Sequence, residues 1–169
     1  MCEISALQLK IKELSSKLVS LCTARGVTFG TAESCTGGLI AASVTDIPGA
    51  SAAFFGGIVS YDNSIKERLL GVRKQTLETY GAVSEQTAKE MARGAVSALG
   101  TELAVSVTGI AGPGGGSPEK PVGLVYIAAS SKNGDIACQK NLFEGNRLQI
   151  RLQTVVSALE MLTFAVEKG

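Results

Sequence analysis

The sequence predicts an α/β fold, a three-layer α/β/α sandwich whose mixed, mostly parallel sheet includes one antiparallel hairpin strand. Short apolar segments of strand character alternate along the chain with segments whose apolar residues recur every three or four positions. This pattern is typical of helices packed on both faces of a central sheet. The hairpin is predicted from Lys132-Asn133-Gly134-Asp135, because Asn-Gly between two apolar segments favours a tight turn between antiparallel strands.

The N-terminal third of the chain predicts a helix, a strand, a second helix and a second strand. The first helix ends at Gly26, a residue suited to a helix C-cap, and carries a single apolar stripe. The stripe consists of Leu7, Ile11, Leu14, Leu18 and Leu21. A strand follows from Val27 to about Glu33. Thr36-Gly37-Gly38 then opens a helix that Pro48-Gly49 stops, and the second strand spans Phe54–Ser60.

The remaining two thirds predict four helices and three strands. Asp62 is a suitable N-cap for a helix over 63–71, and Ser84 with Glu85 opens a longer helix. The other helices are predicted at Lys74–Tyr80 and along an apolar stripe from Leu148 to Val166. The predicted strands are Leu103–Val107, Val122–Ser130 and Ile136–Phe143, and the one long loop is Thr108–Gly123.

Composition restricts the possible functions. The 169 residues suit a single domain, 1–169, and a net charge of +1 argues against electrostatic attraction to nucleic acid or to an anionic membrane. With 0 histidines, a Ser-His-Asp triad, a Cys-His dyad and a histidine-ligated zinc site are excluded. The absence of a signal peptide and of a membrane-length apolar segment predicts a cytoplasmic protein with reduced thiols. Its four cysteines are Cys2, Cys22, Cys35 and Cys138.

Three polar segments follow predicted strands and can therefore meet at one edge of the sheet, where open α/β folds bind their ligands. They are Glu33–Gly38, Ser60–Asn63 with Lys66, and the glycine-rich loop that begins at Thr108.

Ser34 is the candidate nucleophile in the first of these segments. It precedes a predicted helix N-terminus and two glycines, where free backbone N–H groups can stabilise an oxyanion. Without histidine, Lys66 is the candidate base because a desolvated lysine can lose its proton near neutral pH, and Tyr61 can relay that proton. Glu33 is an alternative base, and Cys35 is a rival nucleophile at the same helix end.

Each candidate also has a purely structural explanation. Ser34 can simply cap the helix, and Cys35 can be buried packing. Lys66 can lie on a solvated helix face, and Glu33 can accept structural hydrogen bonds.

The glycine-rich loop and two arginines offer a possible anion site. The loop matches neither GxxxxGK[ST] nor GxGxxG, so it is either an anion-binding nest or a flexible surface loop. Arg147 and Arg151 are four residues apart. They can fork onto a phosphate or lie on a solvated helix face.

Five motifs, in this order along the chain, resemble those of the CinA carboxy-terminal family, named for competence- and damage-inducible protein. The motifs are TAESCTGGLIA (Thr31–Ala41), SYDNSIKERLLGV (Ser60–Val72), GAVSEQTA (Gly81–Ala88), TGIAGPGGGSPEKPVG (Thr108–Gly123) and FEGNRLQIR (Phe143–Arg151). The resemblance extends from about Leu7 to Val166. Longer relatives carry an additional N-terminal domain, and this chain resembles the stand-alone form.

The resemblance implies a three-layer fold and an amidase that needs no metal or other cofactor. The characterised activity of the family is hydrolysis of the carboxamide of nicotinamide mononucleotide (NMN) to nicotinate mononucleotide and ammonia. The family's catalytic serine, lysine and tyrosine correspond to Ser34, Lys66 and Tyr61. Ser34 would attack the carbonyl, Lys66 would take its proton directly or through Tyr61, and water would cleave the acyl-serine.

The resemblance also implies which residues contact the substrate. We expect N–H groups around Thr36, Gly37 and Gly38 to stabilise the oxyanion, and the glycine loop and Arg147 to hold the 5′-phosphate. The full set of expected contacts is Glu33, Thr36, Gly37, Gly38, Thr108, Gly109, Gly112 and Arg147.

Two other functions compete with this one. A non-catalytic nucleotide- or RNA-binding module is disfavoured by the balance of 16 basic and 15 acidic residues. A phosphate-handling transferase is disfavoured because the P-loop Lys-Ser pair and a paired-carboxylate magnesium site are missing. We expect no nucleic-acid or membrane partner, a small nucleotide substrate and, from the alanine-rich helix faces, a homo-oligomer.

Overall fold

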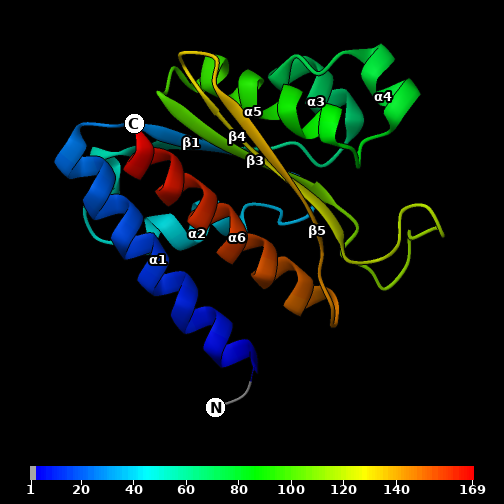
Figure 1. The fold of residues 1–169 in the computed structure, drawn as a ribbon, viewed down its shortest axis with the longest axis horizontal. Helices are drawn as coiled ribbons and strands as arrows, with labels where there is room; N and C mark the ends of the chain where they lie inside the picture. Colours follow the sequence, from blue (N-terminus) through cyan, green and yellow to red (C-terminus); the bar gives the residue numbers. More distant parts are fainter. Residues whose placement is uncertain (1–2) are drawn as a thin grey trace.

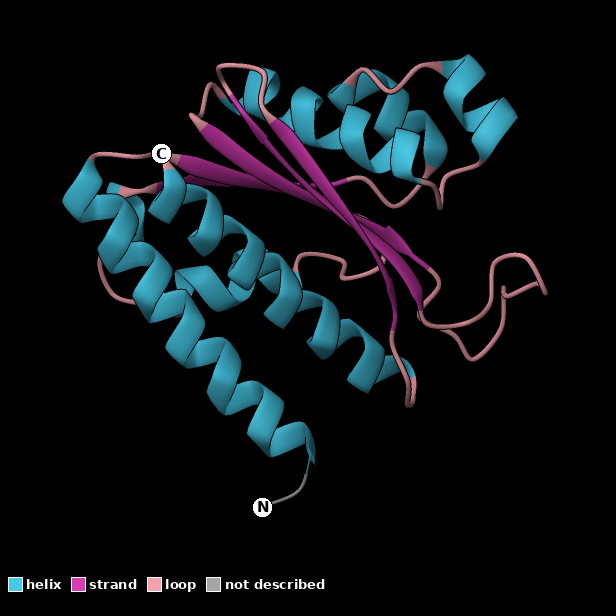
Figure 2. Ribbon diagram, viewed as in Figure 1, coloured by secondary structure: helices cyan, strands magenta, loops and turns pink. Residues whose placement is uncertain are grey.

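The computed structural model describes residues 3–169, so Cys2 lies outside the described residues. One sheet lies between two layers of helices (Figure 1, Figure 2). The strands are β1 (Phe29–Glu33), β2 (Phe54–Val59), β3 (Leu103–Gly109), β4 (Leu124–Ser131) and β5 (Ile136–Leu142). The helices are α1 (Glu3–Arg25), α2 (Leu39–Thr45), α3 (Asn63–Leu70), α4 (Lys74–Tyr80), α5 (Glu85–Leu99) and α6 (Arg147–Lys168), with a 3₁₀ turn at Ala50–Ala52.

The strand order is β2-β1-β3-β4-β5. β1 is parallel to both β2 and β3, whereas β4 is antiparallel to both of its neighbours. A single strand therefore runs against the other four, which confirms the predicted mixed sheet with one antiparallel hairpin strand.

The register of the three parallel strands brings the functional segments together. Glu33 at the end of β1 lies opposite Val59 on one side and Val107 on the other. The residues that follow these positions are Ser34, Ser60 and Thr108. The predicted meeting of the three polar segments at one sheet edge is therefore confirmed.

The helices divide between the two faces of the sheet. α1, α2 and α6 pack together on one face, and α3, α4 and α5 cover the other (Figure 1). Because both faces are covered, β3 is buried along almost its whole length. Within residues 3–169, none of these helices has both the length and the apolar character needed to cross a membrane.

Several strand boundaries differ from the prediction by one or two residues, and two of these differences have a clear physical cause. β1 begins at Phe29 instead of Val27, because the N–H of Val27 still donates to Cys22 O at the end of α1. β3 continues through Thr108 and Gly109, which we predicted to lie in the loop. A Cβ at Gly109 would lie 2.6 Å from Val125 Cγ2, so glycine is what allows this last close approach of β3 to β4.

Candidate functional site

Ser34 lies in the loop between β1 and α2, and the buried carboxylate of Glu33 determines the shape of this loop. Glu33 is 1% exposed. Its oxygens accept hydrogen bonds from the N–H groups of Gly38, Ile40 and Ala41 and from the hydroxyls of Thr31 and Thr36. A carboxylate in this place satisfies N–H groups that a helix N-terminus leaves free. Glu33 therefore has the structural role that was its alternative explanation, and it does not line the cavity beside Ser34.

The N-terminus of α2 consequently does not offer the oxyanion site that we predicted. The N–H of Gly38 donates to Glu33, and the N–H of Gly37 donates to the carbonyl of Ser34 at 3.1 Å. Because these two amides donate within the loop, the geometry does not support their expected role in binding an oxyanion. Their φ angles of 61° and 97° explain why both positions are glycine. The loop's remaining N–H groups belong to Cys35 and Thr36, because the Ser34 N–H donates to Val107 O.

Lys66 is buried on α3 with its amine beside Ser34. The helix begins at Asp62, whose carboxylate accepts from the N–H of Ser64 as an N-cap. Only 1% of Lys66 is exposed. Its Nζ lies 3.2 Å from Ser34 Oγ and donates to the backbone carbonyls of Ser60 at 2.7 Å and Tyr61 at 3.1 Å. The structure thus brings the predicted nucleophile and the predicted base into hydrogen-bond contact.

Burial controls the ionisation of Lys66 and of Cys35. Desolvation lowers the pKa of the Lys66 amine, and the nearby carboxylate of Asp62 opposes this effect in part. Burial raises the pKa of the Cys35 thiol to about 12, so this thiol is protonated at neutral pH. A protonated thiol is a poor nucleophile, which favours Ser34 over its neighbour.

Tyr61 contacts Lys66 through its backbone and Arg147 through its side chain. The residue is 62% exposed, and its hydroxyl accepts a hydrogen bond from Arg147 Nη2 at 3.3 Å. Lys66 meets Tyr61 at the carbonyl oxygen. Ser34 and Lys66 are therefore in direct hydrogen-bond contact, and Tyr61 lines the same cavity.

Arg147 and Arg151 lie in the first turns of α6 and reach two different loops. Arg147 Nη1 donates to the carbonyl of Gly112 at 2.8 Å, and Arg151 Nη2 donates to the carbonyl of Thr36 at 2.7 Å. They therefore do not converge as a fork on one phosphate. The helix start is fixed by a capping box between Asn146 and Gln149, a sequence signal that we did not use.

A cavity of about 190 Å³ joins these groups. Of the predicted residues it is lined by Ser34, Lys66, Tyr61, Thr108, Gly109 and Arg147, and Cys35 also lines it. Ala82 and Val83, between α4 and α5, complete the wall and were missed by the sequence reasoning. The Thr108 hydroxyl holds this wall in place by donating to Ala82 O at 2.8 Å. The signal available in the sequence was the motif Gly81–Ala88, which includes both residues but was not assigned to the site.

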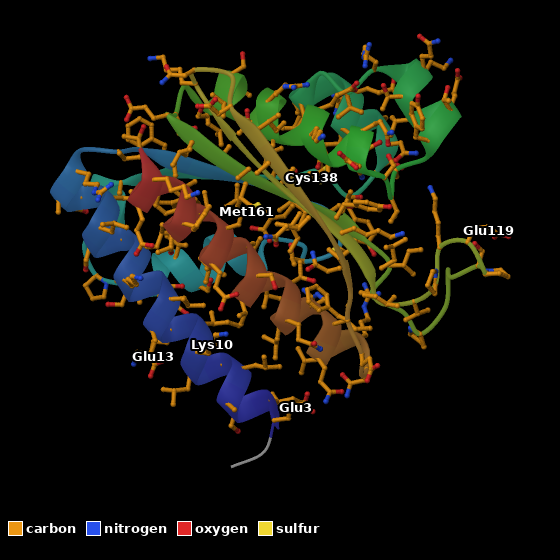
Figure 3. All side chains as sticks on the ribbon, viewed as in Figure 1. Glu3, Lys10, Glu13, Glu119, Cys138 and Met161 are labelled. Atoms are coloured by element: carbon orange, nitrogen blue, oxygen red, sulfur yellow. The ribbon has the colours of Figure 1, made fainter. Side chains whose placement is uncertain are left out.

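The glycine-rich loop reaches the cavity only at its beginning. Gly109 and Ala111 line the cavity, whereas Gly114, Gly115 and Gly116 are exposed. The far part of the loop projects away from the helices, with Glu119 near its tip (Figure 3). Gly112, an expected substrate contact, is buried and presents its carbonyl to Arg147.

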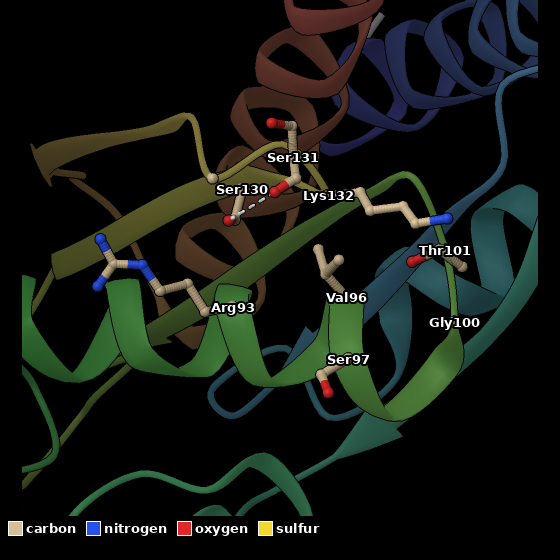
Figure 4. A pocket seen from close by; sticks show the side chains of 9 residues that line it. Arg93, Val96, Ser97, Gly100, Thr101, Ser130, Ser131 and Lys132 are labelled. Carbon is tan, nitrogen blue, oxygen red and sulfur yellow. Dashed lines mark hydrogen bonds between the residues drawn. The ribbon is translucent and has the colours of Figure 1, made fainter.

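Two larger hollows lie at the other end of the sheet, beside the β4–β5 turn. One of about 440 Å³ is bordered by Arg93 and Ser97 of α5 and by Lys132 (Figure 4), and one of about 1260 Å³ adjoins the end of α6. Neither is lined by a residue that the sequence predicts to be catalytic or to bind substrate. The smaller cavity at Ser34 is the candidate active site because it alone joins a buried amine to a hydroxyl among the described residues.

Comparison with known proteins agrees with this geometry. Residues 11–166 match the family model of the CinA C-terminal domain. The chain is 50% identical over 151 residues to a protein of Enterobacter agglomerans named nicotinamide-nucleotide amidohydrolase PncC, covering 89% of this chain and 92% of that protein. It is 52% identical over 139 residues to a CinA-like protein of Leptospira borgpetersenii, covering 82% of this chain but 33% of that relative. The chain thus spans about a third of the length of several curated relatives.

A solved structure shows the same fold. The crystal structure of the competence/damage inducible protein CihA from Agrobacterium tumefaciens superposes with a TM-score of 0.91 at 49% identity, covering 94% of this chain and 96% of that one. The mixed five-stranded sheet, the helical layers and the family-model match lead to one conclusion: the chain belongs to the CinA C-terminal domain family.

Proposed function

We propose that this protein is an amidohydrolase that converts NMN to nicotinate mononucleotide and ammonia, with Ser34 as nucleophile and Lys66 as base. The name of the Enterobacter agglomerans relative, which the chain matches along most of both lengths, supports the substrate. The contact of 3.2 Å between Lys66 Nζ and Ser34 Oγ is the observation that carries the chemistry. A hydroxyl needs an adjacent base to become a nucleophile, and this chain has 0 histidines to provide one.

In the proposed reaction, the hydrogen-bond partners of Lys66 serve a neutral amine as follows. A neutral amine has two N–H groups and one lone pair, and the carbonyls of Ser60 and Tyr61 accept the two N–H groups. The lone pair is then directed to Ser34 Oγ, whose hydroxyl can donate to it. Because desolvation lowers the pKa of Lys66, this neutral state forms more readily than in an exposed lysine, and a neutral amine can accept the proton.

The same site suits the charge of the substrate. NMN carries a positively charged pyridinium ring, which a protonated lysine would repel and a neutral lysine would not. A cavity of about 190 Å³ suits one six-membered ring with its carboxamide, so the ribose and the 5′-phosphate lie outside it. Arg147 stands at this rim with an exposed side chain and is the cation we assign to the phosphate.

The reaction proceeds in two halves. Ser34 Oγ forms a bond to the carboxamide carbon while its proton passes to Lys66, and the oxyanion accepts from the N–H groups of Cys35 and Thr36. The protonated Lys66 then gives that proton to the departing nitrogen, which leaves as ammonia when the C–N bond breaks. In the second half Lys66 deprotonates a water that attacks the acyl ester, and it returns this proton to Ser34 Oγ as the ester bond breaks and nicotinate mononucleotide is released.

Replacing Ser34 by alanine tests this proposal. Ser34→Ala removes the nucleophile, and ammonia release from NMN falls by at least about a thousandfold, as removal of a catalytic nucleophile does. Ser64→Ala is the matched control, because Ser64 lies on the exposed side of α3 and its hydroxyl contacts only Asp62. Ammonia is measured from NMN and from nicotinamide, with and without a chelator. Undiminished turnover by Ser34→Ala contradicts the nucleophile assignment.

The same assay separates the proposed activity from its rivals. Absence of ammonia release from NMN by the parent protein, together with salt-sensitive RNA binding, favours a binding module. Loss of activity in the chelator points to a metal-dependent reaction. The cytoplasmic location and the homo-oligomeric state stay predictions.

A further inference from the structure

We propose that Arg151 is a positioning residue for the reaction, which holds the loop carrying Ser34 in its reactive geometry by binding the carbonyl of Thr36. The inference rests on the proposed function. Arg151 does not line the cavity and does not contact Lys66 among the described residues. Its effect on the reaction is therefore indirect, through the short segment that links Thr36 to Ser34.

The loop is held by opposite charges that bind complementary backbone groups. Glu33 accepts from the loop's N–H groups and from the Thr36 hydroxyl at 2.6 Å. Arg151 Nη2 donates to the Thr36 carbonyl at 2.7 Å, from a helix more than a hundred residues away in sequence. The same nitrogen lies 3.8 Å from where a Cβ of Gly37 would stand. Thr36 is thus bound at its side chain by one charged group and at its carbonyl by another.

Arg151 lies near the start of α6, a packed helix that fixes the position of its side chain beside the loop. Its neighbours Ile150 and Leu152 are buried in the core cluster beneath α6, and the helix start is fixed by its capping box. Residues on a packed helix hold a position more accurately than residues on a loop. The loop around Ser34 contributes Cys35 to this same cluster and is bonded to β3 through the Ser34 N–H, and the contacts of Glu33 and Arg151 hold the segment that follows.

The burial of the Arg151 guanidinium beside Thr36 leaves one of its nitrogens without a partner among the described residues. Arg151 Nε is buried and has no hydrogen-bond partner among the described residues, and burying an unpaired donor is unfavourable. An apolar side chain of similar length would avoid this loss. We attribute the arginine at this position to the hydrogen bond that its Nη2 donates to the Thr36 carbonyl.

The charged groups near Lys66 allow a positioning role of Arg151 to be distinguished from an effect on the pKa of Lys66. Arg151 acts electrostatically on Cys35, which adjoins Ser34, whereas the charged side chain that opposes desolvation at Lys66 is Asp62. Removing Arg151 should therefore slow the reaction without moving the pH at which Lys66 loses its proton.

The test compares Arg151→Met with Gln153→Met. Gln153 lies two residues further along α6 and also donates from its side chain to a backbone carbonyl, that of Glu144 at 2.7 Å, away from the cavity. For Arg151→Met we expect kcat for NMN to fall by about ten- to a hundredfold, the range that a misplacement near 1 Å produces. We expect KM and the midpoint of the pH profile to stay unchanged. Gln153→Met should match the parent in all three.

Restoring a donor should restore part of the rate. Arg151→Lys retains a cation that can donate to Thr36 O and should recover part of kcat. Guanidinium added to Arg151→Ala should raise kcat above that of the same variant in sodium chloride at equal ionic strength. Unchanged kcat in Arg151→Met, a change confined to KM, or a shifted pH midpoint overturns the proposal. So does loss of the folded circular dichroism spectrum in both the methionine and the lysine variants, because the residue would then serve folding alone.

A second readout separates this inference from the proposed function. If the parent releases no ammonia from NMN, the substrate assignment fails, but the reactivity of Ser34 can still be followed with a fluorophosphonate probe. Labelling at Ser34 about tenfold slower in Arg151→Met than in Gln153→Met supports the positioning role in that case. Equal labelling rates refute it.

Discussion

At the scale of single residues, the site depends on a lysine that is buried where its charge is unfavourable. Lys66 has no carboxylate among its hydrogen-bond partners, which are the hydroxyl of Ser34 and two backbone carbonyls. Desolvation without a paired anion favours the neutral amine. Burial without a paired anion therefore favours the neutral base, but it also lowers the stability of the folded protein at low pH, where the amine is protonated.

This conflict predicts how stability changes with pH. In the unfolded chain Lys66 has its ordinary pKa of 10.5, whereas burial lowers its pKa in the folded protein. Between the two values the unfolded state binds a proton that the folded state lacks, so the free energy of unfolding rises with pH across that window. Lys66→Met removes this contribution. Melting temperatures measured from neutral pH to about pH 10 should therefore rise more steeply for the parent than for Lys66→Met.

Lys132→Met provides the control for this comparison, because Lys132 is exposed in the β4–β5 turn. Its melting temperatures should run parallel to those of the parent. Parallel curves for the parent and Lys66→Met would mean that Lys66 stays protonated in the folded protein, and the proposed base would be lost.

At the scale of elements, the short helix α2 and the loop before it form a unit around Glu33. Without that carboxylate the N–H groups of Gly38, Ile40 and Ala41 would be buried or half-buried without partners. From the sequence, the same helix end was predicted to be an anion site for the substrate. The structure does not support that role for these N–H groups, because the anion that binds them is the Glu33 carboxylate of the chain itself.

Glu33→Gln tests the role of this carboxylate. The amide turns one acceptor into a donor that faces other donors, and leaving such groups unpaired costs about 1–3 kcal/mol each. We expect the free energy of unfolding to fall by about 2–4 kcal/mol. The activity should fall as well, because the loop carrying Ser34 loses hydrogen bonds that fix its conformation. Glu102→Gln is the control, since Glu102 is exposed and makes one weak contact at 3.4 Å. A Glu33→Gln variant with parental melting in urea contradicts this role.

At the scale of the whole molecule, the active site is produced by the order of the strands. β1 lies between β2 and β3, so the residues after the three strands meet although they are distant in sequence. α6 closes the site from the C-terminal end of the chain, where Arg147 and Arg151 bind the Gly112 and Thr36 carbonyls. Residues from both ends of the chain are therefore needed to complete one cavity of about 190 Å³.

This arrangement explains which features the sequence could predict. Periodicity and caps identify α3 with Asp62 at its start, and the rule that ligands bind at strand ends places Ser34 near Lys66. The use of Gly37 and Gly38 as internal donors, and of Ala82 and Val83 as a wall, depends on contacts between distant segments. The periodicity of a segment does not reveal contacts of this kind, so these two roles were not predicted.

The most direct test of the account is the pH dependence of kcat/KM for NMN in the parent and in Asp62→Asn. Asparagine can still cap α3, but it removes the negative charge that raises the pKa of Lys66. The account predicts that activity is lost as the pH falls through the pKa of Lys66, and that this acid limb moves to lower pH in Asp62→Asn. An acid limb at the same pH in both proteins would contradict the claim that neutral Lys66 activates Ser34.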